Sequence, residues 1–293
     1  MSHPLKKMKN RLPPWFRQEI PDVALLKDRV RLFKDLRLNT VCQSAHCPNI
    51  FDCFKRHTAT FMILGNICTR NCRFCAVEKG EPSSLDSGEP ENIIKAVKQL
   101  GLRYVVITSV TRDDLTDGGA GQFVAIVDKL HEVFPTIKIE VLIPDFKGKR
   151  KDLERVIASH PDAVGHNLET VPRLYNLVRP QADYRRSLDL LSRIKEINSS
   201  IITKSGIMVG LGEDVSEVIG VMKDLRKVDC DILTIGQYLS PSSEHLPVKR
   251  FVAKDEFAEL ERLVLSTGFK QAFCGPLIRS SFHSEEVFTK CMM

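Results

Sequence analysis

The stretch TATFMILGNICTRNCRFCAV, residues 58–77, joins a strand-like apolar run to three closely spaced cysteines. The run at 58–64 has the β-branched and aromatic residues that are typical of a buried strand. Cys68, Cys72 and Cys75 follow it with the spacing C-x3-C-x2-C, and we call them the first cysteine group. Ligand sites in parallel α/β folds lie at the carboxyl ends of the strands. The stretch therefore predicts a strand of a parallel sheet that leads directly into a thiol-rich site.

The chain after residue 58 alternates between short apolar runs and segments with helical spacing. Repeated strand–helix units with apolar strands predict a parallel sheet covered by helices, hence an α/β fold with an open or closed barrel. We expect about seven strands, at 58–64, 103–110, 137–144, 163–169, 203–211, 231–239 and 269–277. We expect helices between them at 91–101, 122–134, 151–159, 184–197, 215–228 and 254–268.

Both ends of the chain lie outside this alternation, which suggests three parts. We expect an N-terminal extension over 1–57, a βα barrel over 58–274 and a C-terminal extension over 275–293. A length of 293 residues is ordinary for one α/β barrel with terminal additions.

Composition indicates a compact globular protein. Hydrophobic residues make up 43% and charged residues 27%, close to the globular average. The net charge of +6 is not gathered in one long basic run, so we expect a mixed-charge surface and no nucleic-acid partner. The sequence has no apolar run of about 18 residues and no signal-peptide pattern at its N-terminal end. We therefore expect a cytoplasmic location and no membrane association.

A second cysteine group precedes the barrel. It consists of Cys42, Cys47 and Cys53, spaced C-x4-C-x5-C. Clustered cysteines in a reducing compartment bind metals or act in catalysis more often than they form disulfides. Structural zinc usually takes four protein ligands, so two groups of three favour two separate sites. A 4Fe-4S cluster held by three cysteines keeps one iron open to a substrate; the alternative for the first group is a zinc knuckle or inert thiols.

The first cysteine group, with aromatic Phe74 before its third cysteine, resembles the signature of radical S-adenosylmethionine (SAM) enzymes. Within that superfamily the chain resembles the lipoyl synthase family over about residues 38–285. The resemblance implies a partial (βα)6-type barrel with N- and C-terminal extensions, and it places Phe74 among the cofactor-binding residues. It rests on segments 41–53, 58–77, 108–123, 165–171, 203–213, 236–242 and RSSFHS at 279–284. The family usually has tyrosine at Phe282, so any role of that hydroxyl is absent here.

The resemblance implies two 4Fe-4S clusters and SAM as cofactors. The first cysteine group would hold the reducing cluster, whose open iron binds SAM. One electron then cleaves SAM to a 5′-deoxyadenosyl radical, which removes hydrogens from unactivated carbons 6 and 8 of a protein-bound octanoyl-lysine. The enzyme would be a sulfurtransferase that inserts two sulfur atoms at those carbons and yields lipoyl-lysine.

The second cysteine group would hold the auxiliary cluster, which supplies the sulfur. Its fourth ligand in the family is a serine of the RSS motif, which we place at Ser281, with Ser280 as the alternative. An alkoxide is a harder ligand than a thiolate, so the iron that it binds should be easier to lose. Arg279 would support the cluster charge or the ionisation of the serine.

Several polar residues are candidates for binding SAM. Asn167 and Glu169 lie two residues apart on the predicted strand 163–169, so both would point to the same face and into the cavity. They suit the ribose hydroxyls or the methionine end of SAM; the alternative is a polar pair on the surface. Thr108, Arg179 and Lys204 are weaker candidates for the methionine group.

Polar residues follow four of the predicted strands and should surround one cavity. They are Thr108 and Ser109, Asn167 and Glu169, Gly210–Glu213, and Gln237 and Tyr238. The small residues of 210–213 would also let the backbone approach the adenine closely. The acidic segment RDDLTDGGAG, 112–121, could be a divalent-metal loop, but acidic residues before a helix more often mark its start.

The implied partners are an octanoylated lipoyl-carrier domain, of the 2-oxoacid dehydrogenase or glycine-cleavage H type, and an electron donor such as ferredoxin or flavodoxin. Two alternative functions are another radical SAM enzyme of sulfur insertion and a non-catalytic iron-sulfur protein of electron transfer.

Overall fold

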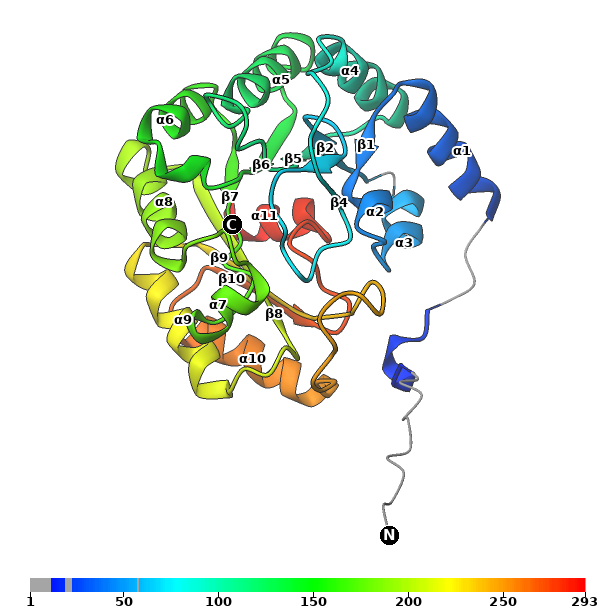
Figure 1. The fold of residues 1–293 in the computed structure, drawn as a ribbon. Helices are drawn as coiled ribbons and strands as arrows, with labels where there is room; N and C mark the ends of the chain where they lie inside the picture. The colour runs from blue at the N-terminus through cyan, green and yellow to red at the C-terminus, as the bar shows by residue number, and fades with distance from the viewer. Residues whose placement is uncertain (1–11, 19–22, 57, 293) are drawn as a thin grey trace.

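The computed structural model describes residues 12–18, 23–56 and 58–292. Residues 1–11, 19–22 and 57 of the predicted N-terminal extension lie outside the described residues, as does residue 293. Figure 1 looks along an α/β barrel in which helices form an outer ring around the strands.

Within the described residues, seven parallel strands are arranged in the sheet in the same order as in the sequence. They are β2 (Thr60–Ile63), β5 (Tyr104–Ser109), β6 (Lys138–Leu142), β7 (Ala163–Gly165), β8 (Ile202–Val209), β9 (Ile232–Gln237) and β10 (Gln271–Gly275). The short strand β1 (Asn39–Thr40) adds to β2 in antiparallel direction. In the described part of the chain β10 pairs with β9 alone, so the barrel is not closed. All seven predicted strands are confirmed.

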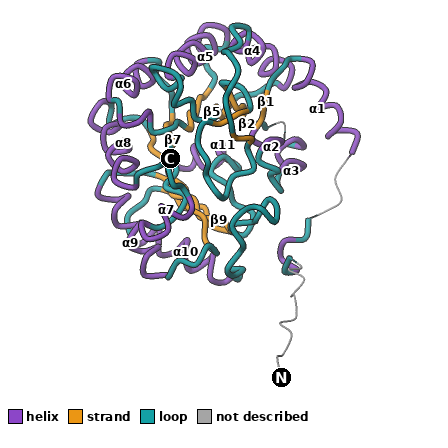
Figure 2. The backbone as a smooth tube through the Cα atoms, viewed as in Figure 1, coloured by secondary structure: helices purple, strands orange, loops and turns teal. Residues whose placement is uncertain are grey.

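One long helix follows each of the first six parallel strands and packs on the outer face of the sheet (Figure 2). These helices are α4 (Glu89–Leu100), α5 (Ala120–Val133), α6 (Arg150–Ala158), α8 (Tyr184–Ile197), α9 (Val215–Lys227) and α10 (Lys254–Ser266). The ends are set by local signals. Asp183 accepts a hydrogen bond from the Arg186 amide at the start of α8, and Gly101 ends α4 with a left-handed φ of 63°. The expected six helices and the partial (βα)6-type barrel are confirmed.

The predicted strand 163–169 is too long. β7 ends at Gly165, which pairs with Lys204, whereas Glu169 forms an isolated bridge with Ile207. The segment from Gly165 to Glu169 therefore holds one residue more than the segment that it faces, which interrupts the ladder as a bulge does. Glu169 also has a left-handed φ of 67°. Asn167 and Glu169 consequently lie in the loop beyond the strand rather than on it.

The remaining elements cover the ends and the open side of the barrel. The N-terminal residues form η1 (Pro14–Phe16), α1 (Val23–Asp35), α2 (Val41–Ser44) and α3 (Ile50–Lys55). The loop that holds the first cysteine group is bordered by the paired strands β3 (Ile67–Cys68) and β4 (Glu78–Lys79). Short helices η2 (Phe146–Gly148), η3 (Pro172–Leu174) and α7 (Tyr175–Val178) lie after β6 and β7, and α11 (Ser284–Met292) ends the described chain. The division at residues 57 and 274 stays a prediction, although β1 joins the barrel sheet.

Helix α11 covers the amino ends of the strands. Its Val287 and Phe288 are buried against Tyr104, Ile202 and Ile232, which lie at the start of β5, β8 and β9. Apolar burial therefore fixes the C-terminal extension beneath the barrel, as the position of α11 behind the centre of Figure 1 also shows.

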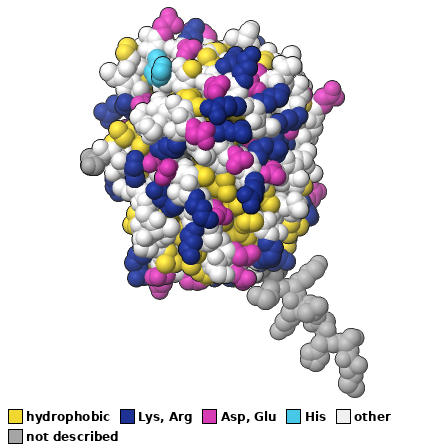
Figure 3. All heavy atoms as spheres, turned by 90° about the vertical axis from the view of Figure 1, so that its left-hand side faces the viewer, with side chains coloured by type: hydrophobic (Ala, Val, Ile, Leu, Met, Phe, Trp, Pro, Cys, Tyr) yellow, Lys and Arg dark blue, Asp and Glu magenta, His cyan; other side chains and the backbone are white. Residues whose placement is uncertain are grey.

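The outer surface mixes both signs of charge. Figure 3 shows the side of the barrel that carries α6 and α8, where Lys and Arg side chains lie among Asp and Glu. Arg150 of α6 bridges Glu154 on its own helix and Glu196 on α8. In the chain segments that the structure describes, no helix has the length and apolar character needed to cross a membrane.

A glycine in β9 lets the C-terminal segment pass through the barrel end. A Cβ atom at Gly236 would lie 2.1 Å from the carbonyl oxygen of Ile278, a distance that no side chain can occupy. The absence of a side chain at Gly236 thus permits the backbone just before the RSS motif to rest directly on β9.

We expect Gly236→Ala to lower the free energy of unfolding by about 1–3 kcal/mol, because the added methyl group must displace the backbone at Ile278. Chemical denaturation of the metal-free chain measures this change. Gly220→Ala is the matched control, since its Cβ would meet nothing within 4 Å and alanine favours the helix α9. Equal stability of the two variants would contradict the proposed contact.

Candidate functional site

A cavity of about 660 Å³ opens among the carboxyl ends of the strands and the two terminal extensions. It brings together residues that are more than 200 positions apart in the sequence. The candidate residues that line it are Cys42, Cys47, Cys53, Phe74, Cys75, Thr108, Asn167, Glu169, Arg279, Ser280 and Ser281. The cavity therefore brings the second cysteine group and the RSS motif together with Cys75 of the first group.

The first cysteine group leaves β2 through a tight turn. Leu64 has a left-handed φ of 70°, and the buried Glu89 carboxylate accepts its amide hydrogen at 3.1 Å. Further along the loop, the Arg73 amide donates to the carbonyl of Val178 at 2.9 Å, and His245 Nε2 lies 3.1 Å from the carbonyl oxygen of Cys75. The loop is thus fastened to several barrel elements. Cys75 lines the cavity, whereas Cys68 and Cys72 are not among the lining residues.

The sulfur atoms of this group are close enough to affect one another. Burial, with a smaller contribution from the charges of Cys72 and Cys68, raises the pKa of Cys75 to about 12. Burial also raises the pKa of Cys72, while the nearby charge of Arg179 lowers it. The Cys72 and Cys75 thiols are protonated at neutral pH in the metal-free chain, so a bound cation must displace their protons.

The second cysteine group lies on two short helices at the open side of the barrel. Cys42 is on α2, Cys53 is on α3, and Cys47 lies in the turn between them. Burial raises the pKa of Cys42 to about 11 and that of Cys53 to about 12, and the charges of neighbouring cysteines in the group add to both shifts. All nine cysteines are free, including the three outside these groups. Cys42, Cys47 and Cys53 therefore form a second compact set of thiols.

The C-terminal segment is held against the second cysteine group by polar contacts. Asn49 Nδ2 donates to the carbonyl of Leu277 at 2.6 Å. His283 Nε2 lies 3.1 Å from Asp52 Oδ2, and Arg56 Nη1 donates to Glu286 Oε1 at 2.7 Å. These contacts place Ser280 and Ser281 at the same cavity as the thiols.

Arg279 lines the cavity and lies close enough to both Cys47 and Glu169 for their charges to act on it. Burial lowers the pKa of Arg279, and the charges of Cys47 and Glu169 oppose that shift. Arg279 also lowers the pKa of Cys47, although burial of that thiol outweighs the effect. A guanidinium at this position compensates negative charge on either side.

Asn167 and Glu169 both line the cavity, although they come from a loop. Asn167 Nδ2 donates to Glu169 Oε1 at 3.0 Å, and Asn167 Oδ1 is buried without a hydrogen-bond partner among the described residues. Arg179 does not line the cavity. It lies behind the loop and donates to the carbonyl of Asn167 at 2.7 Å and to Tyr175 Oη at 3.1 Å. Arg179 therefore supports this loop, and the free oxygen of Asn167 is available to a ligand.

Lys204 is not among the residues that line the cavity, so its contact with SAM stays a prediction that this position does not support. Its Nζ pairs with Glu140 at 3.0 Å and donates to Ser284 Oγ at 2.8 Å. Both members of the ion pair are 2% exposed. The residue faces the barrel interior near the amino end of β8, so it holds α11 in place instead.

Two other predictions concern the polar residues after the strands and the segment 210–213, and they had different outcomes. Ser109, Gln237 and Tyr238 line the cavity as predicted, together with Thr108, whose Oγ1 donates to the carbonyl of Leu142 at 2.8 Å. Residues 210–213 do not line it, because the Glu213 carboxylate turns back to accept the amides of Gly210 and Leu211. That this segment approaches the adenine stays a prediction.

The acidic segment 112–121 starts a helix, as expected. Asp117 accepts the amides of Gly119 and Gly121 at the start of α5. Asp113 binds Arg70, and Asp114 binds Arg112. The three carboxylates of this segment thus pair with different groups and do not converge on one point. Among the described residues, no three His, Cys, Asp or Glu side chains are arranged to hold a single metal ion.

Sequence reasoning does not identify several residues of the site, because these residues meet through contacts between distant segments. The pairing of Asp52 and Arg56 with His283 and Glu286 at the cavity rim joins positions more than 200 residues apart. No local pattern in the sequence indicates such a pairing. The sequence reasoning does not single out Arg70 either, although it lies between Cys68 and Cys72 and binds Asp113.

Comparison with known proteins agrees with this geometry. The family model of the radical SAM superfamily matches residues 62–225. The crystal structure of methylornithine synthase (PylB) superposes with a TM-score of 0.53 over 75% of this chain and 72% of the other, at 16% identity. The partial barrel with a cysteine loop after its first parallel strand is that of a radical SAM enzyme.

Curated relatives narrow the class. The lipoyl synthase of Caldanaerobacter subterraneus subsp. tengcongensis is 54% identical over 94% of this chain and 96% of its own length. That of Caldicellulosiruptor saccharolyticus is 52% identical over 95% of this chain and 98% of its own length. The chain belongs to the lipoyl synthase family of the radical SAM superfamily.

Membership of this family gives the reaction. The enzyme is a sulfurtransferase that uses SAM and two 4Fe-4S clusters to insert sulfur at carbons 6 and 8 of an octanoyl-lysine, and its substrate is an octanoylated carrier protein. The family assignment decides against both alternative functions, the different sulfur-inserting enzyme and the electron-transfer protein.

We expect Lys204→Met to destabilise the fold by about 3–5 kcal/mol, because Glu140 would lose its buried partner. The affinity of the reconstituted enzyme for SAM should stay unchanged, since Lys204 lies outside the cavity. Denaturation and equilibrium binding of SAM measure the two effects. A large loss of SAM affinity in protein that remains folded would restore Lys204 as a contact.

Proposed function

We propose that the first cysteine group holds the reducing 4Fe-4S cluster of this reaction, and that the second cysteine group holds the auxiliary cluster with Ser281 as its fourth ligand. The observation that supports this best is the shared cavity, which is lined by Cys75 from the first group, by the entire second group and by Ser281. A reaction that moves sulfur from one centre to a carbon activated at the other needs both centres to open onto the same cavity.

The donor chemistry fits two cubane clusters. Each group offers three free, partly or fully buried thiols, and thiolates are the preferred ligands of iron-sulfur clusters. Each cysteine of a cubane binds a different iron, so the sulfur atoms need not converge on one ion. When bound, the reducing cluster and SAM supply the radical that removes hydrogen from an unactivated carbon, a step beyond any protein side chain.

The polar residues of the cavity divide between the two centres. Asn167 and Glu169 bind SAM, with the free Oδ1 of Asn167 as an acceptor for a ribose hydroxyl or the amino group. Thr108 and Phe74 line the same cavity and bound the SAM site. Arg179 positions Asn167 through its carbonyl rather than contacting SAM.

Arg279 and Ser281 serve the auxiliary centre. Arg279 carries a positive charge beside Cys47, which favours thiolate ligation and offsets the negative charge of the loaded site. Ser281 supplies the hard fourth ligand, and Ser280 is the alternative at the same cavity. Sulfur loss is easier where the ligand is the less firmly bound alkoxide.

Partner and location are inferred from the chemistry. The carrier is a lipoyl domain of the 2-oxoacid dehydrogenase type or the glycine-cleavage H type, and the electron donor is a ferredoxin or flavodoxin. A cytoplasmic location suits nine free cysteines, because clustered thiols stay reduced there.

The division of the two groups is tested by counting iron and measuring two products. Anaerobically reconstituted protein should bind about eight irons per chain, as two cubanes require. Replacing the first cysteine group with alanines should halve the iron and abolish 5′-deoxyadenosine formation. Replacing the second group should also halve the iron but leave 5′-deoxyadenosine formation intact. Loss of 5′-deoxyadenosine in both variants would contradict the assignment.

Ser281→Ala should lower lipoyl formation on an octanoyl-lysine peptide on the order of tenfold, while SAM cleavage changes little. The reason is that the serine binds the sulfur-donating centre and takes no part in cleaving SAM. Mass spectrometry of the peptide and chromatography of the nucleoside measure the two. Ser280→Ala is the matched control and should keep both; a reversed result would assign the ligand to Ser280.

A further inference from the structure

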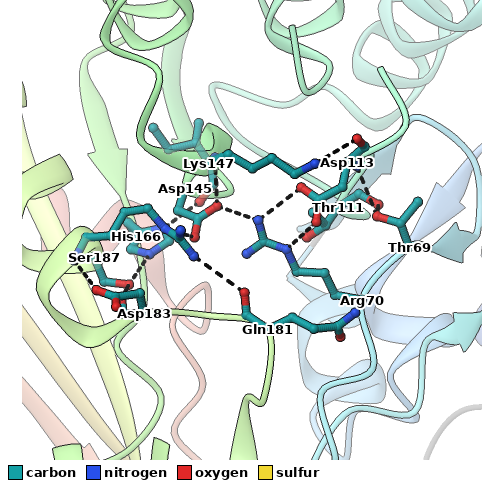
Figure 4. A network of polar contacts seen from close by, with 12 residues as sticks. Thr69, Arg70, Thr111, Asp113, Asp145, Lys147, His166, Gln181, Asp183 and Ser187 are labelled. Atoms are coloured by element: carbon teal, nitrogen blue, oxygen red, sulfur yellow. Dashed lines mark hydrogen bonds and ion pairs between the residues drawn. The ribbon is translucent and has the colours of Figure 1, made fainter. Parts of the chain in front are cut away.

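A buried carboxylate lies behind the loop of the first cysteine group and accepts two arginines (Figure 4). Asp145 follows β6 and is 1% exposed. Its Oδ1 accepts Arg70 Nη2 at 2.6 Å and its Oδ2 accepts Arg186 Nε at 2.8 Å. The Lys147 amide adds a hydrogen bond at 3.1 Å. Burial raises the pKa of Asp145, but the hydrogen bond and charge of Arg70 outweigh it, so the pKa is well below its usual range.

Arg70 connects this carboxylate to a second one. It lies between Cys68 and Cys72 in the sequence and is 5% exposed. Its Nε and Nη2 donate to Asp113 at 2.7 and 3.0 Å, while Nη2 also reaches Asp145. A planar guanidinium can span two carboxylates in this way, whereas a lysine ammonium is a point charge. Arg70 therefore ties the cysteine loop to β6 and to the segment after β5.

Asp145 also reaches the next residue of the loop. Arg186, which binds Asp145, lies 3.4 Å from the carbonyl oxygen of Gln181 through its Nη2. The side-chain oxygen of Gln181 accepts the amide of Asn71. Both residues are thus linked to the buried Asp145 carboxylate, Arg70 directly and Asn71 through Gln181 and Arg186.

The segment at 111–113 completes the support. The amide and hydroxyl of Thr69 donate to the carbonyl of Thr111 at 3.0 and 2.9 Å, and the Asp113 amide donates to Thr69 Oγ1 at 3.0 Å. Figure 4 shows Thr69, Thr111 and Asp113 around Arg70. These hydrogen bonds give the acidic segment 112–121 a structural role in addition to its place at the start of α5.

The network directs two backbone amides at one sulfur. The Thr111 amide lies 3.3 Å and the Arg70 amide 3.4 Å from Cys68 Sγ. Hydrogen bonds to a cluster sulfur stabilise the more negative, reduced state and so raise the reduction potential. Both donors belong to residues that the network fixes.

We propose that Arg70 and Asp145 are positioning residues, which aim the amides of Arg70 and Thr111 at Cys68 and thereby set the reduction potential of the cluster that drives SAM cleavage. The proposal rests on the proposed function, in which Cys68 binds that cluster.

Arg70→Lys and Asp145→Asn test this in the reconstituted full chain. The first keeps the positive charge but loses the fork, and the second keeps the shape but loses the charge. Both should shift the midpoint potential to more negative values and slow SAM cleavage on the order of tenfold. A redox titration followed by electron paramagnetic resonance, using the signal that responds to SAM, measures the potential. An unchanged potential in both variants overturns the proposal.

Asp231→Asn is the matched control. Asp231 is also a buried carboxylate with two cations, Lys195 at 2.5 Å and Lys270 at 2.9 Å, but it lies at the amino end of β9. It should lose stability without a shift in potential. An equal shift in Asp231→Asn would show a general effect of destabilisation and overturn the proposal.

Hydrogen exchange in the metal-free chain separates this inference from the cluster assignment. The amides of Arg70 and Thr111 should exchange faster in Asp145→Asn than in Asp231→Asn. Equal exchange overturns the positioning role whatever the iron count shows. If the first cysteine group proves to bind no cluster, the proposed function fails, while the exchange result still decides whether Asp145 orders the loop.

Discussion

The barrel is an incomplete ring, and its open side governs the rest of the architecture. Seven parallel strands leave two edges whose backbone groups need cover, since an exposed edge invites pairing with other chains. β1 covers one edge by pairing with β2. On the other side, Asn49, which precedes α3, donates to the carbonyl of Leu277 after β10. The two chain ends therefore converge on the gap, and the second cysteine group and the RSS motif converge with them.

The elements of the fold follow from the sequence where local signals are strong. The six long helices have clear apolar periodicity with caps such as Asp183 and Gly101, so their ends were predicted within two residues. The error at 163–169 has a physical cause, because alternation of side chains in the sequence does not reveal the extra residue before Glu169. Only the register against β8 defines it.

The residues that we propose as cluster ligands can be identified from the sequence, whereas the residues that support them cannot. Cysteine spacing and resemblance indicated both groups and the serine, and the structure brings most of these residues to one cavity. Lys204 shows the limit of such reasoning. A lysine on a strand can face the interior at either end of a barrel, and whether it meets a ligand or a buried carboxylate such as Glu140 depends on tertiary contacts. The network around Asp145 is not predictable from the sequence for the same reason, since it joins four separate segments, 69–71, 111–113, 145–147 and 181–186.

Gly206 and Gly236 both line the cavity, at positions where βα barrels usually carry the branched side chains of a packed interior. The space directly beside both glycines is taken up by protein, since a Cβ would lie 2.7 Å from Thr234 Oγ1 at Gly206 and 2.1 Å from the carbonyl oxygen of Ile278 at Gly236. A hollow of about 660 Å³ nevertheless remains next to them, so apolar burial that would stabilise an ordinary barrel is missing here. Any group that fills the hollow and binds only the folded chain adds its binding energy to the stability of the fold. Maturation and folding are therefore linked in this enzyme: a cell that is short of iron or sulfur will accumulate a less stable, protease-sensitive protein as well as an inactive one.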